Sequence, residues 1–216
     1  KYVFRLEKEA IPTWTKFLQG YYDRSGISSD SFDQAVSVQS EGISLSGEMQ
    51  QKNIVLQQVV RPSTYYMGFN MLDPVVGGYD DRARKLRQAI TIAYDTEEYI
   101  KIFMNGRGET AMSPIPPGIF GYQQGQEGNL KTVFDWEGGK PVRKSLEYAK
   151  ELLVQAGYPD GRDAQTGEPL VINLDTTASS SSKARLSWIK KQFNNIGLQL
   201  NVRATDYNRF KGKMET

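Results

Sequence analysis

A run of hydroxyl side chains late in the chain is the strongest candidate for a binding site. Thr176, Thr177, Ser179 and Ser180 come directly after Asp175 and precede a segment with helical periodicity. In open α/β sheets, ligands bind beyond the carboxyl ends of strands and near helix N-termini, whose free N–H groups favour anions. The alternative is that these hydroxyls only cap the helix and satisfy its first backbone donors. The sequence leaves both interpretations open.

Four further residues are candidates for ligand contact. Asn70 ends a predicted strand, where a buried amide needs several hydrogen-bond partners. Trp14, Tyr21 and Tyr22 are aromatic residues on the expected hinge side of the protein, and packing is the ordinary use of such side chains. We therefore predict ligand contact for these four residues alongside a structural alternative for each.

Two missing residue types restrict the chemistry. The 216 residues include no cysteine and no histidine. This excludes a thiolate nucleophile, a disulfide, a cysteine-based zinc site and a histidine-dependent triad. The carboxylate pairs Asp80/Asp81 and Glu97/Glu98 stand at predicted helix starts, where the helix dipole explains them. We assign no catalytic residue, no metal ligand and no cofactor, and we predict that the protein is not an enzyme.

The charge balance and hydropathy exclude two further classes. Lys and Arg number 27 and Asp and Glu 25, for a formal net charge of +2. Such a balance does not favour nucleic-acid binding through a strong overall field. No apolar run approaches the roughly 20 residues that a membrane-spanning helix requires. The first six residues are too few and too charged for a signal peptide, and their pattern is that of a strand interior. We therefore expect the chain to be a piece of a longer protein.

The elements that position the hydroxyl run form a predicted βαβ unit. Leu170, Ile172 and Leu174 alternate with polar residues, which is typical of a strand. The stripe Leu186, Ile189, Phe193 and Ile196 then predicts a helix that ends at Gly197, and residues 198–204 alternate again. The two strands should therefore run parallel, with a right-handed crossover.

The stretch 65–94 is predicted to be the centre of the core. Residues 65–71 are short, apolar and aromatic, as in a buried strand. A loop over 73–79 follows, and then a helix that begins near Asp80, with Ala83, Leu86, Ile90 and Ala93 as its apolar stripe.

The remaining segments complete an α/β pattern. We expect strands over 2–6 and 54–60, a surface loop over 37–47 and an irregular excursion over 106–128. Further helices are expected over 11–18, around Phe32 and Ala35, over 48–53, from Asp95 to Met104, from about Ser145 to Ala156, and after a cap at Thr205 or Asp206. This order predicts a mostly parallel sheet with helices on both faces.

Four pieces of the sequence resemble the middle region of family 5 extracellular solute-binding proteins, the peptide, nickel and oligosaccharide receptors of ABC importers. The pieces are Tyr66-Met67-Gly68-Phe69-Asn70-Met71, Leu86-Arg87-Gln88-Ala89-Ile90, Ala93-Tyr94-Asp95 and Pro114-Ile115-Pro116-Pro117-Gly118. Their order and spacing carry the resemblance, which covers essentially the whole chain and is strongest from Tyr65 onward.

The resemblance implies one lobe of a type II periplasmic-binding-protein fold. Residues 1–216 would form most of the C-terminal, domain III-like lobe, with the first lobe and the final C-terminal stretch absent. The implied function is capture of a small solute, most often an oligopeptide, by hinge closure and its delivery to ABC permease subunits in the membrane. The implied location is periplasmic or extracellular, at the membrane through the transporter or a lipid anchor, and the implied full-length protein is a monomer without nucleic-acid partners.

Two other functions stay open at this point. The same type of lobe also serves as the sensor of cytoplasmic transcription regulators, and a helix-turn-helix before Lys1 would favour that alternative, whereas a signal peptide or lipobox would favour transport. An α/β enzyme that uses carboxylates alone is the third class, and loss of an activity on changing Asp23 or Asp175 would be needed to support it.

Overall fold

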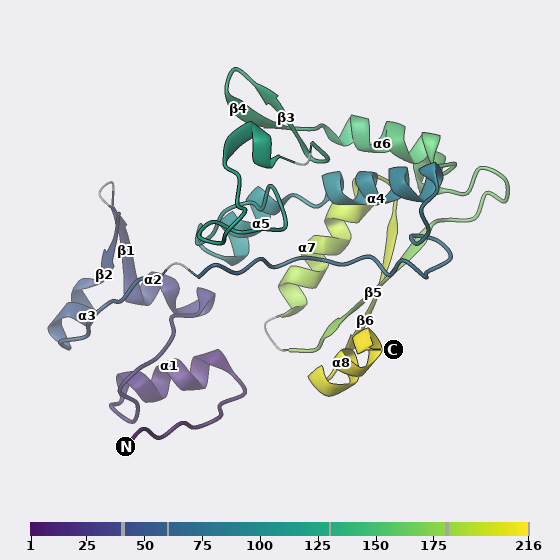
Figure 1. Cartoon of the computed structure of the whole chain (residues 1–216). Coiled ribbons are helices and arrows are strands. Elements are labelled where there is room, and N and C mark those ends of the chain that lie inside the picture. Colours follow the sequence, from purple (N-terminus) through teal and green to yellow (C-terminus); the bar gives the residue numbers. More distant parts are fainter. Residues whose placement is uncertain (40–41, 60, 130, 180–181, 216) are drawn as a thin grey trace. The chain divides into compact units, whose positions relative to one another are not determined.

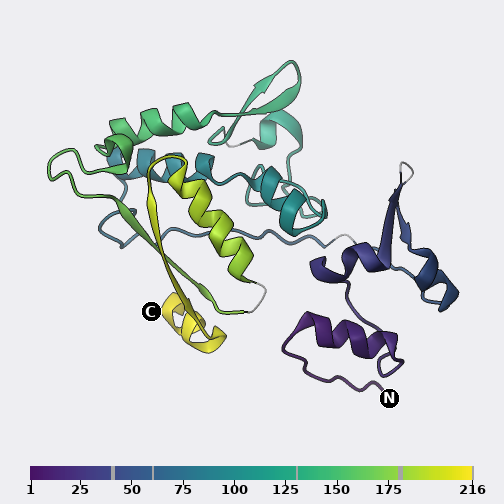
Figure 2. The ribbon, with the colours of Figure 1, turned by 180° about the vertical axis from the view of Figure 1, so that it is seen from behind.

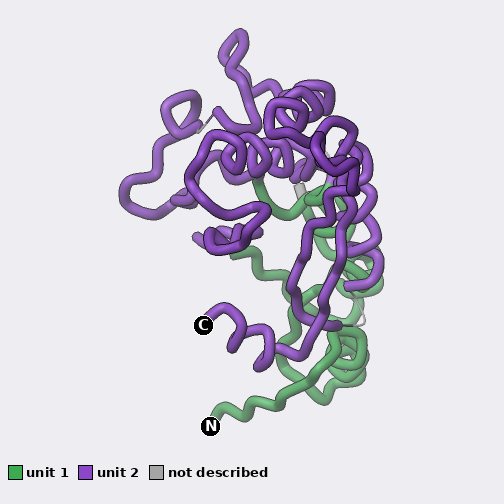
Figure 3. The backbone as a smooth tube through the Cα atoms, turned by 90° about the vertical axis from the view of Figure 1, so that its right-hand side faces the viewer, with its two compact units in different colours: residues 1–61, 99–109 green, residues 62–98, 110–216 purple. Residues whose placement is uncertain are grey.

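The computed structural model describes residues 1–39, 42–59, 61–129, 131–179 and 182–215. The chain separates into two compact units, coloured differently in Figure 3. Unit 1 comprises Lys1–Arg61 and Tyr99–Glu109, and unit 2 comprises Pro62–Glu98 and Thr110–Thr216. Each unit has an apolar core of its own, so each is described by itself.

Unit 1 combines short helices with one hairpin (Figure 1). Its helices are α1 (Ala10–Leu18), the 3₁₀ helix η1 (Ser29–Ser31), α2 (Phe32–Ala35), α3 (Gly47–Gln51) and, from Tyr99 onward, the end of α5 (Thr96–Phe103). Strands β1 (Val36–Gln39) and β2 (Gly42–Leu45) pair in antiparallel fashion. The buried core consists of Trp14, Phe32, Ala35, Val36 and Met49. The three helices predicted in this part of the chain are thereby confirmed.

The predicted surface loop over 37–47 is wrong, because most of it forms the β1–β2 hairpin. Its serine and glycine content favoured a loop. In the structure Val38 stands opposite Ile43, and this apolar cross-strand pair supports the ladder that local composition did not predict.

The strands predicted over 2–6 and 54–60 are also wrong. Residues 2–6 and 54–59 are not in strands, and residue 60 lies outside the described part of the chain. Tyr2 and Phe4 are 90% and 92% exposed. An alternating pattern becomes a strand only where a neighbour accepts its backbone hydrogen bonds, and among the described residues these two segments have no such neighbour.

Unit 2 contains most of the regular structure (Figures 1 and 2). In chain order its elements are α4 (Asp81–Ala93), the start of α5 (Thr96–Phe103), η2 (Gly125–Gly128), β3 (Phe134–Glu137), β4 (Lys140–Arg143), α6 (Leu146–Gln155), η3 (Pro159–Gly161), β5 (Val171–Thr177), α7 (Ser182–Asn194), β6 (Gln199–Thr205) and α8 (Tyr207–Glu215). Helices α4 and α6 lie side by side, and α7 packs against β6. The antiparallel hairpin of β3 and β4 was not predicted.

Side-chain caps start the helices of unit 2 where the sequence placed them. Asp80 accepts a hydrogen bond from the N–H of Ala83 at 2.7 Å, and Ser145 accepts one from Tyr148 at 3.1 Å. Asp95, the capping residue predicted for α5, likewise accepts a hydrogen bond from the N–H of Glu98 at 2.9 Å. Each cap satisfies a backbone donor that the first turn of a helix leaves free.

The predicted βαβ unit is confirmed as a parallel pair joined by a helix. Strands β5 and β6 run in register from Val171 opposite Gln199 to Thr177 opposite Thr205. Helix α7 between them buries Ile189 and Phe193 in the core of unit 2, where they join residues of α4 and α6. This unit presents the hydroxyl run at the carboxyl end of β5.

The buried strand predicted over 65–71 is wrong. The segment is extended but unpaired among the described residues, and Tyr65 and Tyr66 are 88% and 82% exposed. The turn that follows is tightly built: the carboxylate of Asp73 accepts from the N–H groups of Val75 and Val76 at 2.8 and 3.0 Å. At Gly77 a Cβ atom would lie 2.4 Å from the carbonyl oxygen of Asp73, so the turn requires glycine there.

The fold class is α/β, as predicted. The described strands form two antiparallel pairs and one parallel pair, so the mostly parallel sheet is not seen in this part of the chain. The two hairpins, which sequence analysis did not predict, account for the antiparallel pairs. The region 106–128 is irregular as expected, apart from the short η2 at its end.

Candidate functional site

The turn at the carboxyl end of β5 holds three of the predicted site residues. Thr176 and Thr177 are the last residues of β5 and are half-buried, whereas Ser179 is exposed. Ser180 lies outside the described residues. The N–H of Ala178 donates to the carbonyl oxygen of Thr205 at 2.7 Å, which anchors the turn to the end of β6.

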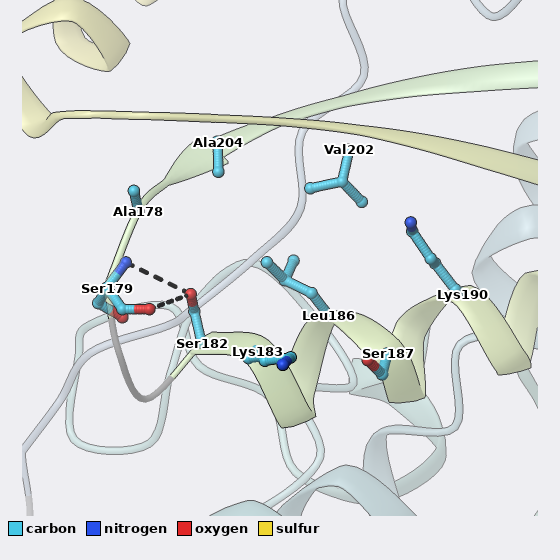
Figure 4. Close-up of a pocket in the computed structure, with 9 residues that line it drawn as sticks. All are labelled: Ala178, Ser179, Ser182, Lys183, Leu186, Ser187, Lys190, Val202 and Ala204. Atoms are coloured by element: carbon cyan, nitrogen blue, oxygen red, sulfur yellow. Dashed lines mark hydrogen bonds between the residues drawn. The ribbon is translucent and has the colours of Figure 1, made fainter.

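Ser182, which sequence analysis did not name, makes the contacts that join this turn to α7. Its hydroxyl donates to the carbonyl oxygen of Ser179 at 2.7 Å and lies 3.4 Å from the N–H of the same residue (Figure 4). Ser182 is only 4% exposed. The hydroxyl of Ser182 therefore closes the turn onto the main chain of Ser179, and it does so from the first residue of α7.

A shallow groove of about 320 Å³ begins at this turn and lies between α7 and β6 (Figure 4). Its walls carry small hydroxyl groups, two lysines and several apolar side chains, contributed by Ala178, Ser179, Ser182, Lys183, Leu186, Ser187, Lys190, Val202 and Ala204. Thr176 and Thr177 are not part of this lining. Of the predicted residues of the hydroxyl run that the structure describes, Ser179 is the one that lines the groove.

Thr205 adds a polar atom beside the turn. Its Oγ1 is buried and has no hydrogen-bond partner among the described residues, and Thr205 stands opposite Thr177 in the ladder. The sequence proposed Thr205 or Asp206 as the cap of the last helix. Asp206 makes that cap, because its carboxylate accepts from the N–H groups of Asn208 and Arg209 at 3.1 Å each.

The other candidates in unit 2 have structural partners. Asn70 is exposed rather than buried, and its side-chain oxygen accepts from the N–H of Leu72 at 3.0 Å, which makes it a turn residue. Asp175 forms ion pairs with Lys213 and, at 3.9 Å, with Arg203. A carboxylate held by two cations on β6 and α8 is already used in packing the βαβ unit.

The aromatic candidates belong to unit 1. Trp14 is 5% exposed and donates its indole N–H to Gln34 at 3.0 Å, so it is a core residue. Tyr21 is 74% exposed. The phenol of Tyr22 donates to Glu7, and this hydrogen bond raises the pKa of Tyr22. The pKa of Glu7 is lowered by its hydrogen bonds to Lys16 and then to Tyr22.

Neither a metal centre nor a membrane span is found in the described part of the chain. No three carboxylates there are close enough to hold a metal ion. None of the helices formed by those residues is long and apolar enough to cross a bilayer.

Comparison with known proteins decides the family. The model described as bacterial extracellular solute-binding proteins, family 5 middle, matches residues 11–216. The chain belongs to family 5 of the bacterial extracellular solute-binding proteins. The resemblance carried by the four sequence pieces is thereby confirmed. The match leaves out only the first ten residues of this family 5 chain.

Relatives of this family 5 chain are considerably longer. The heme-binding protein A of Haemophilus influenzae is 34% identical over 77 residues, which cover 36% of this chain and 12% of that protein. The dipeptide binding protein from Pseudoalteromonas sp. SM9913, solved in complex with Met-Leu, superposes with a TM-score of 0.59 at 18% identity, over 97% of this chain and 35% of that one. HbpA2 from Haemophilus parasuis gives a TM-score of 0.53 at 18% identity, with the same coverage of 97% and 35%. These two structures share the fold, and the chain spans a minor part of their length.

Proposed function

We propose that this family 5 chain is most of the C-terminal lobe of a two-lobed receptor that captures oligopeptides for an ABC importer. The observation that carries the proposal is the family match over residues 11–216. The fold shared with two longer binding proteins supports it, since the shared part covers 97% of this chain and 35% of each of those proteins.

The turn after β5 supplies groups that suit a peptide main chain. A peptide offers alternating N–H donors and C=O acceptors, and hydroxyls can pair with either. Thr176, Thr177 and Ser179 provide hydroxyls at the carboxyl end of β5, and the N-terminus of α7 lies beyond them. Contacts to the main chain alone would accept many side chains and give broad specificity.

The mechanism follows from two lobes and needs no covalent chemistry. The solute binds between the lobes, and rotation about a hinge encloses it, because the closed form makes contacts that the open form lacks. The closed receptor then docks on the permease subunits in the membrane. This places the protein in the periplasm or outside the cell, held by the transporter or by a lipid anchor, as a monomer.

Thermal unfolding of the natural full-length protein tests this function. The protein is melted with a series of di- to pentapeptides, sugars and metal chelates, since ligands that bind only the native state raise the midpoint by mass action. A rise with peptides supports the proposal, and the dependence on peptide length gives the size of the cleft. A rise with sugars or metal complexes alone keeps the receptor and changes the solute. If none of the three classes shifts the midpoint, the receptor function is wrong and the regulatory sensor becomes the better explanation.

A further inference from the structure

The outer edge of β6 is unpaired in the part of the chain that the structure describes. β6 forms its ladder with β5 alone. The N–H of Gln199 donates to Leu170 at 3.1 Å, and the carbonyl of Thr205 accepts from Ala178 at 2.7 Å. Because backbone groups alternate in direction along a strand, those of the even-numbered residues between them point to the opposite edge. That edge therefore presents donors and acceptors to any chain that runs beside it.

A groove with an apolar floor accompanies this edge along α7. The hollow of about 320 Å³ that begins at Ser179 continues into a second one of about 450 Å³, and both include Lys190. Val202 and Ala204 line the first hollow from β6, and Leu200 lines the second. Figure 4 shows Leu186 and Lys190 extending from α7 towards the strand. Three apolar residues of β6, namely Leu200, Val202 and Ala204, therefore line the two hollows.

The wall of the groove is cationic. From Ser182 to Thr205 the sequence has five Lys or Arg residues and no Asp or Glu, although the whole chain carries only +2. Lys183, Lys190 and Lys191 line the two hollows. None of these three lysines makes an ion pair with another described residue. Such a concentration of one sign attracts and orients a partner of the opposite sign.

We propose that this edge docks an extended, acidic segment of a partner protein, which adds as a strand to β6. Main-chain hydrogen bonds to the outer edge of β6 provide the register, as in other cases of strand addition. Apolar side chains of the segment cover Leu186 and Val202, and its carboxylates face the three lysines. β6 has seven residues, so a segment of similar length fills the edge.

A second copy of this chain does not fit the same edge. Pairing β6 with another β6 would bring the lysines of two grooves to one interface, and neither hollow is lined by a carboxylate. Like charges placed in this way oppose association. The charge of the groove therefore selects an acidic partner and disfavours self-pairing through exposed strand edges.

A synthetic peptide tests the proposal on the natural full-length protein. The probe is a blocked, fluorescent seven-residue peptide of alternating Glu and Val, and its binding is followed by anisotropy at low salt. Two control peptides carry N-methyl groups, one on the odd-numbered residues and the other on the even-numbered residues. One of these two peptides therefore lacks the backbone N–H donors that would face β6. A third control replaces Glu by Gln. We expect saturable binding of the probe, loss of binding for one N-methylated peptide, and about tenfold weaker binding of the Gln peptide.

The matched variants are K183Q/K190Q in the groove and K140Q/K150Q on β4 and α6. All four lysines are exposed, so both pairs remove the same charge without disturbing the core. The groove pair should weaken probe binding about tenfold, and the control pair less than twofold. Equal losses in the two pairs, unchanged binding of both N-methylated peptides, or no saturable binding at all would each refute the docking edge. Failure of the probe leaves the proposed solute function intact, because the thermal screen tests that function separately.

Discussion

The guanidinium of Arg82 donates to the phenol oxygen of Tyr158 at 2.5 Å and lies 4.7 Å from the centre of the same ring. The Nε of Arg82 also donates to the carbonyl of Ala156 at 3.0 Å, at the end of α6. One side chain of α4 therefore satisfies both a buried tyrosine and a helix C-terminus. This links the first turn of α4 to the last turn of α6.

Removal of that link should destabilise unit 2. In Arg82→Ala the phenol of Tyr158, which is 5% exposed, loses its partner and the stacked cation. We expect a loss of about 1–3 kcal/mol in the free energy of unfolding, measured by chemical denaturation. Arg84→Ala on the same helix is the control. In the described part of the chain the ion pair of Arg84 is with the exposed Asp81, so this change should alter stability by less than about 1 kcal/mol. Equal effects of the two changes would contradict the assigned role of Arg82.

Adjacent residues of α6 separate core packing from exposed surface. Leu153 is 1% exposed and packs in the core of unit 2, whereas Val154 is 57% exposed. Leu153→Ala should destabilise the protein by about 2–5 kcal/mol through the cavity that it leaves. Val154→Ala should stay within about 0.5 kcal/mol. Denaturant melts of the two variants measure the difference, and similar midpoints would mean that α6 packs through another face.

Two glycines should respond to alanine in opposite directions. At Gly77 a Cβ would lie 2.4 Å from Asp73 O and 2.5 Å from Met71 O, so the turn before α4 must open. Gly212 lies inside α8 with open space around its Cβ position. We expect Gly77→Ala to lower the melting temperature, and Gly212→Ala to leave it unchanged or to stabilise α8 by about 0.5–1 kcal/mol. A stabilised Gly77→Ala would show that the Asp73 turn differs from the structure.

The loop after α6 should contribute a pH-dependent stability. The N–H groups of Thr166 and Gln165 donate to the carboxylate of Asp163 at 3.0 and 2.9 Å, and Arg82 lies 3.7 Å away; these contacts lower the pKa of Asp163. A pKa that is lower in the folded state stabilises the fold above the unfolded value of about 3.9 and loses that contribution as the pH falls through the folded value. The difference in melting temperature between the wild type and Asp163→Asn should therefore shrink as the pH falls from 7 towards 2.5. A difference that stays constant over this range would contradict the assignment.

Two serines of the site should separate structure from binding. Ser182→Ala removes the hydroxyl that closes the turn onto α7 and should lower stability by about 1 kcal/mol. Ser179→Ala keeps the main-chain groups that bond to Ser182, so we expect a smaller loss of stability than for Ser182→Ala, together with weaker solute binding. Calorimetry for stability and the thermal screen for solutes measure the two effects. If Ser179→Ala leaves solute binding unchanged in the full-length protein, Ser179 is not a contact residue.

Local patterns were sufficient where a segment satisfies its own backbone. The caps at Asp80 and Ser145 and the apolar stripes of α4, α6 and α7 are properties of neighbouring residues, because helical hydrogen bonds close within the same segment. The parallel pair of β5 and β6 was also predictable, since the crossover helix between two alternating runs restricts their direction. The four sequence pieces that resemble family 5 also identified the family without the structure, because their order and spacing lie along the chain itself.

Tertiary structure decided the rest. The aromatic run 65–71 forms no strand although its composition is that of a buried one, because a strand depends on a partner that the segment itself cannot supply. Tyr65 and Tyr66 are exposed, whereas Phe69 packs against the core. The hairpin of β1 and β2 formed across a Ser- and Gly-rich stretch because each of its strands has the other as a partner. At the site, the sequence identified the hydroxyl run, but only the structure showed that Ser182 bonds to the main chain of Ser179 and that Ser179 is exposed. The cationic groove along β6 appeared only when α7 was folded against the strand, since residues spaced along two elements share a surface only after those elements pack.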